Sequence, residues 1–164
     1  MYHRCELCGN VVFSLTGLDS CPLCGAPLDK LKAYDPPDLA GSRTEENLKA
    51  ALAGESQANR RYLAFAQLAR DAGLEDAAAA FEAAAADETL HAHSHLGYLR
   101  GAGDSRANIE AAIAGETYET EKMYPEFTRV AEEEGFPEIA QYLKWVAGDE
   151  KRHAGRYRQA LEEL

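Results

Sequence analysis

The chain has 164 residues, of which 46% are apolar and 27% charged, so its composition is that of a folded globular protein and excludes a disordered or collagen-like chain. Twenty-eight acidic residues outnumber 17 basic ones, and the resulting net charge of −11 disfavours nucleic acid as a partner. No segment has the length and apolarity of a membrane span or a secretory signal. We therefore expect a cytoplasmic protein without a membrane partner.

All four cysteines lie within the first 24 residues, in two Cys-x-x-Cys pairs that are each followed by a glycine. In a reducing compartment this pattern indicates metal binding and not disulfides. The glycines allow the tight turns that bring backbone N–H groups to the sulfurs, so the spacing predicts a tetrathiolate site. The spacing alone fits iron and zinc equally well. The predicted ligands are Cys5, Cys8, Cys21 and Cys24.

Two domains are expected from the distribution of breaker residues. Residues 1–34 contain the cysteines and the β-rich stretch 11–15, which together predict a small knuckle-and-hairpin module. The sequence Asp-Pro-Pro-Asp at 35–38 cannot continue a helix or a central strand, so it predicts a linker. The predicted domains are therefore residues 1–38, the metal module with its linker, and residues 39–164.

The second domain is rich in Ala, Glu, Leu and Arg and predicts a mainly α fold. Ser42 and Glu45 form the pattern of a helix-capping box, and glycine and proline signals divide the rest of the chain. These signals predict four long helices that form a bundle. Their expected ranges are 43–71, 74–100, 105–134 and 137–162.

The helical part contains an internal duplication. Residues 47–55 match residues 108–116 at six of nine positions, at an offset of 61. At an offset of 62, the motif Asp-Glu-x-x-His at 87–91 recurs at 149–153, and Tyr62 matches Tyr124. A period of about 60 residues is too long for a solenoid repeat, so it predicts two copies of a helix pair in one four-helix bundle.

Carboxylate and imidazole side chains recur at matching positions of the two copies. A carboxylate on an apolar helix face is strongly unfavourable unless it is paired or binds a metal. A Glu and a His three residues apart lie on one face and can bind the same ion. One Glu from each of two helices, with a Glu-x-x-His from each of the other two, is the ligand set of di-iron and di-manganese bundles. The predicted ligands are Glu55, Glu88, His91, Glu116, Glu150 and His153.

The other polar residues beside these motifs are interpreted separately. His93 and His95 correspond to non-ligating residues in the second copy, so we expect them to be exposed to solvent. Asp87 and Asp149 fit either a hydrogen bond to the ligand imidazole or a solvated helix charge. Glu119 has no acidic counterpart, and it is either a seventh ligand that makes the two metal sites inequivalent or an exposed residue.

Together these motifs resemble those of the rubrerythrin family, non-haem di-iron peroxidases with a ferritin-like bundle and a rubredoxin-like domain. The resemblance covers nearly the whole chain. In the more familiar arrangement the cysteine module follows the bundle, whereas here it comes first, as in reverse rubrerythrins. The resemblance rests on Ala-Gly-Glu55, Asp-Glu88-x-x-His91, Gly-Glu116-x-x-Glu119, Met123-Tyr124-Pro125-Glu126-Phe127, Asp-Glu150-x-x-His153 and the two cysteine pairs.

The resemblance implies a mainly α fold, with a ferritin-like four-helix bundle preceded by a small β-rich rubredoxin-like domain. It implies two iron ions in a carboxylate-bridged site and one iron, or zinc, in the four-cysteine site. It further implies that Glu119 replaces His91 on one iron as the redox state changes, and that Tyr62 and Tyr124 are hydrogen-bonded near the cluster. Glu119 and these two tyrosines are therefore the catalytic candidates. The implied di-iron ligands are Glu55, Glu88, His91, Glu116, Glu119, Glu150 and His153.

The leading functional hypothesis is a peroxidase that reduces hydrogen peroxide to water with electrons passed through iron in the four-cysteine site. The resemblance implies that a rubredoxin or an NADH-dependent reductase supplies these electrons. Two alternatives remain open. One is a ferroxidase or iron-handling ferritin-like protein, against which the cysteine module argues because storage needs no electron relay. The other is a zinc-stabilised helical module without enzymatic activity.

Two structural expectations come from chain geometry. The change of offset from 61 to 62 places one extra residue between Glu116 and Tyr124, which predicts a π-bulge in the third helix. In a ferritin-like bundle the second and third helices run parallel, so the link between them must cross the bundle. Residues 101–104 are too few to do so within one chain, which predicts a domain-swapped homodimer.

Overall fold

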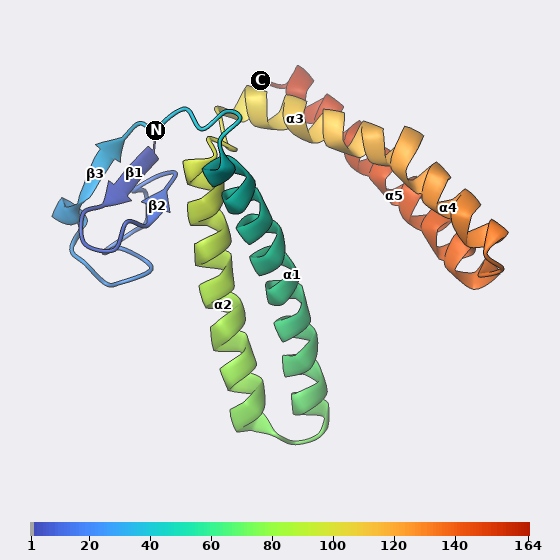
Figure 1. Cartoon of the computed structure of the whole chain (residues 1–164), viewed down its shortest axis with the longest axis horizontal. Helices are drawn as coiled ribbons and strands as arrows, with labels where there is room; N and C mark the ends of the chain where they lie inside the picture. Colours follow the sequence, from blue (N-terminus) through green and yellow to red (C-terminus); the bar gives the residue numbers. More distant parts are fainter. Residues whose placement is uncertain (1) are drawn as a thin grey trace. The chain divides into compact units, whose positions relative to one another are not determined.

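The computed structural model describes residues 2–164 (Figure 1). The chain forms two compact units: a first unit that ends at Ala102 and a second unit, Gly103–Leu164. The first unit contains the cysteine module and two long helices, and the second contains the remaining helices. Within residues 2–164, no helix has the length and apolarity needed to cross a membrane.

The cysteine module is a small antiparallel sheet with the strand order β2-β1-β3. Its strands are β1 (Tyr2–Cys5), β2 (Val11–Val12) and β3 (Leu31–Tyr34), with a 3-10 turn η1 (Leu28–Lys30) before the last. Only two residues of the β-rich stretch 11–15 form strand, so the expected hairpin is shorter than its β-branched composition suggests. Two of the four cysteines, Cys5 and Cys21, are buried in the core of the module beside Ala26 and Leu31.

Two antiparallel helices, α1 (Arg43–Asp71) and α2 (Glu75–Tyr98), lie side by side in the first unit (Figure 1). The hydroxyl of Ser42 accepts a hydrogen bond from the backbone N–H of Glu45 at 3.1 Å, as the capping box predicts. Small buried residues, among them Ala66 and Ala85, let the two helices approach closely. The predicted ranges of these helices agree with the structure within two residues at each end.

The cysteine module is fixed to the last two turns of α2. The backbone N–H of Val11 donates to the hydroxyl of Ser94 at 3.1 Å, and the Tyr98 hydroxyl donates to the carbonyl of Gly9 at 2.7 Å. Gly97 lies so close to the module that an added Cβ would be 2.6 Å from Cγ1 of the buried Val11. The module therefore packs at a defined position on the last two turns of α2, which we call its seat.

The second unit consists of α3 (Ser105–Tyr118), a π-helical segment η2 (Glu119–Met123), α4 (Tyr124–Glu133) and α5 (Pro137–Glu162). The backbone N–H of Tyr124 donates to the carbonyl of Glu119, five residues earlier, which is the hydrogen bond of a π-helix. The predicted π-bulge between Glu116 and Tyr124 is thus confirmed. The hydroxyl of Thr120 donates to the carbonyl of Glu116 at 2.7 Å, so this widened turn keeps the acceptor satisfied.

The predicted fold class is confirmed, because four helices, the third interrupted by η2, follow a small three-stranded sheet that carries the cysteines. The predicted domain boundary at residue 38 stays a prediction. Arg100 lies at the end of α2 with a φ of 54°, a left-handed conformation that is uncommon for a residue with a side chain. Its guanidinium pairs with Asp35 at 3.0 Å and donates to the carbonyl of Pro36, which holds the linker against the end of α2.

Candidate metal centres

The four cysteine sulfurs form a compact cluster at the end of the module. The Sγ atoms of Cys5 and Cys24 are 3.7 Å apart, and those of Cys8 and Cys21 are also 3.7 Å apart. A tetrahedral metal with bonds of about 2.3 Å to sulfur requires edges of roughly 3.8 Å, whereas a disulfide brings its sulfurs to about 2.05 Å. All four predicted cysteine ligands are therefore arranged as a tetrathiolate site requires.

Backbone N–H groups approach the sulfurs, as the glycine-containing turns predict. Burial raises the pKa of the Cys5 thiol, but backbone hydrogen bonds from Cys8 and Leu7 outweigh it and lower this pKa to about 7. Burial raises the pKa of Cys8 to about 12. The thiolate form is thus favoured at Cys5, whereas burial favours the neutral thiol at Cys8.

A first ligand group, Glu55, Glu88 and His91, lies between α1 and α2. Nδ1 of His91 is 3.0 Å from Oε2 of Glu55 and 3.3 Å from Oε2 of Glu88. All three ligand atoms lie within 4.8 Å of one another. The two carboxylates and one imidazole therefore converge on a volume that suits one cation.

A second ligand group, Glu116, Glu150 and His153, repeats this arrangement between α3 and α5. Nδ1 of His153 is 2.7 Å from Oε2 of Glu150 and 3.6 Å from Oε2 of Glu116. The duplication seen in the sequence thus produces the same triad in both units.

Each ligand group contains a buried oxygen that fits a metal. Oε2 of Glu55 and Oε2 of Glu116 are buried and have no hydrogen-bond partner. Such an oxygen is costly unless a cation or a donor compensates it. Mixed carboxylate and imidazole donors suit iron and manganese, so the residues of each group fit a bound metal ion.

The electrostatics of the two groups differ. Burial raises the pKa of Glu55, but a hydrogen bond with Glu88 and the charges of His91 and His95 outweigh it, so the pKa is lowered. The pKa of Glu116 is raised by burial and by its hydrogen bond with Glu150. The first carboxylate is therefore ionised more readily than the second.

The three catalytic candidates have different surroundings. Glu119 is half-buried in η2, outside the second ligand group, and its charge contributes to the raised pKa of Tyr124 after burial and the charge of Glu150. Tyr62 packs against the rings of Phe65 and Phe81, with centroids 6.4 and 6.3 Å away. The predicted roles of Glu119, Tyr62 and Tyr124 stay predictions.

The expectation that His95 is exposed to solvent is wrong. Only 24% of its side chain is exposed, and its Nε2 is 3.5 Å from Oε1 of Glu55. Its position four residues after His91 on one helix was the available signal, because residues four apart share a face. His93 is exposed as expected, and its ring lies edge-on to Phe13 with centroids 5.8 Å apart.

The aspartates that precede the ligand Glu residues behave as helix charges. Asp87 is exposed, and Asp149 forms an ion pair with Arg152. The environment of Asp87 favours the solvated interpretation, whereas Asp149 is half-buried and paired with Arg152.

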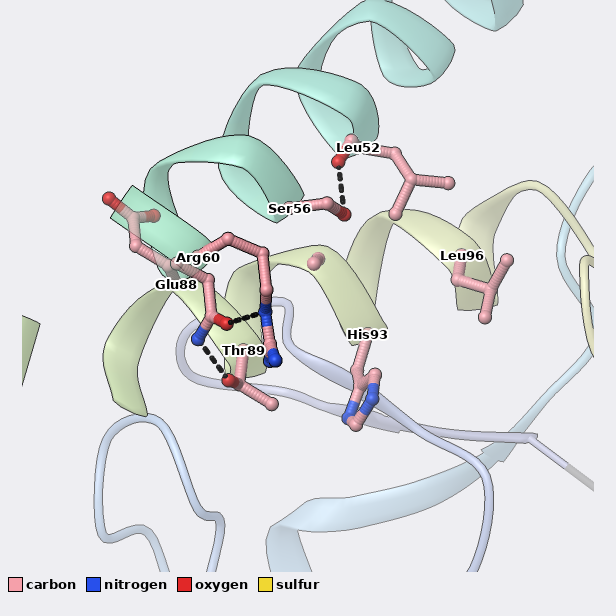
Figure 2. Close-up of a pocket in the computed structure, with 9 residues that line it drawn as sticks. Leu52, Ser56, Arg60, Glu88, Thr89, His93 and Leu96 are labelled. Carbon is pink, nitrogen blue, oxygen red and sulfur yellow. Dashed lines mark hydrogen bonds between the residues drawn. The ribbon is translucent and has the colours of Figure 1, made fainter. Parts of the chain in front are cut away.

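Two cavities flank the first ligand group. Figure 2 shows one of about 280 Å³, to which α1 contributes Arg60 and α2 contributes Glu88, Thr89 and His93. Asn59, a buried residue that also lines this cavity, donates to the hydroxyl of Thr89 at 2.9 Å and accepts from Nε of Arg60 at 2.9 Å. This network links α1 to α2 one turn from the ligand carboxylates.

The second cavity, of about 300 Å³, is shared by the cysteine module and the first ligand group. Cys8 and Leu23 line it from the module, and Glu55, His91 and His95 line it from the helices. The tetrathiolate site and the first ligand group of one chain are therefore separated by a single small cavity.

Comparison with known proteins is consistent with these centres. The rubrerythrin family model matches residues 46–161. Curated relatives include a rubrerythrin of Porphyromonas gingivalis (39% identical over 132 residues, 73% of this chain and 66% of the relative) and one of Nitratidesulfovibrio vulgaris (38%, 73% and 69%). Nigerythrin of Nitratidesulfovibrio vulgaris is 38% identical over 135 residues, 74% of this chain and 67% of the relative.

The chain thus covers about two thirds of the length of these relatives, slightly less for the Porphyromonas gingivalis protein. Its cysteine cluster precedes the region that the family model matches. Both ligand groups lie inside that region. The chain belongs to the rubrerythrin family, with its four-cysteine module at the N-terminal side of the helical domain.

Proposed function

We propose that the protein is a non-haem di-iron peroxidase that reduces hydrogen peroxide to water. The observation that carries the proposal is the coexistence of two matched Glu-Glu-His groups with a tetrathiolate cluster that shares a cavity with the first of them. When bound, iron in these sites supplies the two electrons that the reduction of one peroxide to two waters requires.

The side chains have distinct roles in this proposal. The carboxylates of Glu55 and Glu116, each with a buried oxygen that has no hydrogen-bond partner, would hold the metal. The phenol of Tyr124, whose pKa is raised by burial and by Glu150, stays protonated and is suited to donate a hydrogen bond. Glu119, half-buried in the widened π turn, is the carboxylate proposed to exchange with His91 as the charge of the site changes.

The proposal also covers the redox relay and its setting. The thiols of the module remain reduced in the cytoplasm, where the four cysteines are available as ligands. A rubredoxin or an NADH-dependent reductase is the proposed electron donor. A ferroxidase or iron-handling role, and a zinc-stabilised module without turnover, are the competing functions.

Two measurements test the function. The iron-loaded, reduced protein should be oxidised by stoichiometric peroxide much faster than by dioxygen, as followed by stopped-flow absorbance. Comparable rates would favour the ferroxidase function and contradict the peroxidase. Metal analysis with a visible spectrum identifies the metal held by the four cysteines, because ferric tetrathiolate is intensely red, whereas zinc there is colourless and removes the relay.

We further propose that the di-metal site forms in a domain-swapped homodimer. With both ligand groups level in one bundle, the nine residues from His91 to Arg100 and the eleven from Ser105 to Glu116 place the link ends roughly 30 Å apart along the axis. The backbone N–H of Gly101 donates to the carbonyl of Leu96 at 2.9 Å, which caps the C-terminal end of α2. Lengthening the link from this side would break that hydrogen bond. The stretch from Arg100 to Ser105, even fully extended over five Cα–Cα steps, spans at most roughly 18 Å.

Capping at the start of α3 supports the same conclusion. The carboxylate of Asp104 accepts from the backbone N–H of Ala107 at 2.9 Å, so lengthening the link would remove this cap. Large side chains also stay exposed in both units, for example Leu68 (66%) and Trp145 (67%). In the proposed dimer each site takes Glu55, Glu88 and His91 from one chain and Glu116, Glu119, Glu150 and His153 from the other. The two chains exchange these roles between the two sites.

A further inference from the structure

His95 lies in the wall of the cavity that the cysteine module shares with the first ligand group. The cavity is bounded by Cys8 and Leu23 from the module and by Glu55 from α1. Neither the duplication nor the ligand triad gives His95 a role. Its side chain is nevertheless directed at a predicted metal ligand, with Nε2 at 3.5 Å from Oε1 of Glu55.

The two oxygens of Glu55 face two different imidazoles. Oε2 is 3.0 Å from His91, itself a predicted ligand, and Oε1 is 3.5 Å from His95. Oε2 is buried and forms no hydrogen bond although His91 is close, and Oε1 lies at ion-pair distance from Nε2 of His95. His95 is thus the group beside Oε1, and Oε2 is available to a cation.

The backbone around His95 is held firmly. The preceding residue, Ser94, is buried and accepts the hydrogen bond from Val11 of the module. Tyr98, one turn later, donates to the carbonyl of Gly9. His95 therefore projects from a turn of α2 whose position is fixed by contacts with the module.

The second unit has no equivalent of this contact. The matching residue, at an offset of 62, is Tyr157, which is 38% exposed. Glu116 accordingly has one imidazole beside it, that of His153, at 3.6 Å. The second imidazole distinguishes the first ligand group from its duplicate.

We propose that His95 is a positioning residue that holds Oε1 of Glu55 and thereby directs Oε2 to the metal bound by the first ligand group. This inference rests on the di-metal site of the proposed function but not on the peroxidase reaction. Outer contacts of this kind are commonly worth about 10- to 100-fold in metal affinity. The effect is confined to one of the two metal positions, because the second unit lacks the contact.

The test uses the full chain with zinc in the four-cysteine site and Co²⁺ titrated into the carboxylate sites, followed by the visible bands of bound Co²⁺. His95→Leu should weaken one of the two Co²⁺ affinities by about 10- to 100-fold and leave the other unchanged. His95→Gln, which keeps a side-chain N–H donor, should restore most of the loss. His93→Leu, on the same helix, and Tyr157→Leu, at the duplicate position, are the matched controls and should bind as the wild type does.

Wild-type affinities in His95→Leu would overturn the proposal. So would equal losses in the Leu and Gln variants, because such a result indicates a packing role for the ring. A wild-type protein that binds no pair of Co²⁺ ions would overturn the di-metal site and this inference together. Normal Co²⁺ binding without peroxide-dependent oxidation would overturn only the peroxidase, which keeps the two failures distinguishable.

Discussion

The two helical units carry the same Glu-Glu-His triad in different surroundings. In the first, Glu55 lies between His91 and His95, and its pKa is lowered although burial opposes this. In the second, Glu116 has one imidazole beside it, and burial raises its pKa. The two halves therefore share their Glu-Glu-His geometry, whereas residues outside the triad make them electrostatically unequal.

The units also differ in their backbones. α1 is continuous over 29 residues, whereas the corresponding part of the second unit is divided into α3, η2 and α4. The inserted residue widens the helix beside Glu119, a candidate that has no acidic counterpart in the first unit. The first unit instead carries the cysteine module. Each half has therefore gained one feature that the other lacks.

The largest expected effect is the recovery of activity when two inactive variants, each damaged in a different unit, are combined in one dimer. Chains with Glu55→Ala and chains with Glu150→Ala should each be inactive as homodimers, because each damages both sites of its dimer. After joint refolding, random pairing makes half of the dimers mixed, each with one intact site, so about one quarter of the wild-type peroxide turnover should return.

The matched control for this experiment mixes Glu55→Ala with Glu88→Ala. Both changes lie in the first unit, so every swapped heterodimer has two damaged sites and no activity should return. Recovery in the control, or none in the test pair, would contradict the swapped arrangement.

Gly97→Ala tests the seat of the cysteine module. The added methyl group would lie 2.6 Å from Cγ1 of Val11, so the strand must move or the module must detach, at a cost of about 1–3 kcal/mol. Gly155→Ala is the control in the second unit, where an added Cβ meets nothing within 4 Å, and it should stabilise α5 by up to about 1 kcal/mol. Thermal unfolding measures both, and a destabilisation of equal size in the two variants would argue against a specific seat.

The smallest expected effect is a difference in pH dependence of the metal-free protein. The pKa of Glu116 is raised above its ordinary 4.5, so its contribution to stability is present below that pH and is lost as the pH rises through the folded-state value. The pKa of Glu55 is lowered, so its contribution is present above pH 4.5 and is lost as the pH falls through the lowered value. Near neutral pH, Glu116→Gln should therefore stabilise the metal-free chain and Glu55→Gln should destabilise it. Urea midpoints that move in the same direction would contradict this contrast.

The helices were predictable from the sequence because their ends carry strong local signals. Ser42 and Asp104 cap α1 and α3 through their side chains, and Gly73 and Gly135 adopt positive φ between consecutive helices. The π segment was predictable for a different reason. A duplicated sequence provides an internal reference for register, and one additional residue must be accommodated somewhere in the helix.

The two Glu-Glu-His groups were predictable from the same duplication. The requirement that a candidate recur in both copies, however, excluded His95. A residue that belongs to only one copy is discarded when matching positions are required. The seat of the module was not predictable either, because the contact of Gly97 with Val11 depends on tertiary placement and leaves no periodic signal. Local signals and repeats thus determined the elements and the shared chemistry, whereas the features specific to one half required the structure.

The short, capped connection from Arg100 to Asp104 has a kinetic consequence for the proposed dimer. Subunits that have exchanged helix pairs cannot separate by dissociation of a surface, because each must withdraw two helices from both bundles. Exchange between dimers then requires an opening comparable to global unfolding, and its rate follows the unfolding rate and not the protein concentration. A pre-formed wild-type dimer and a pre-formed variant dimer should therefore remain unmixed for long periods under native conditions.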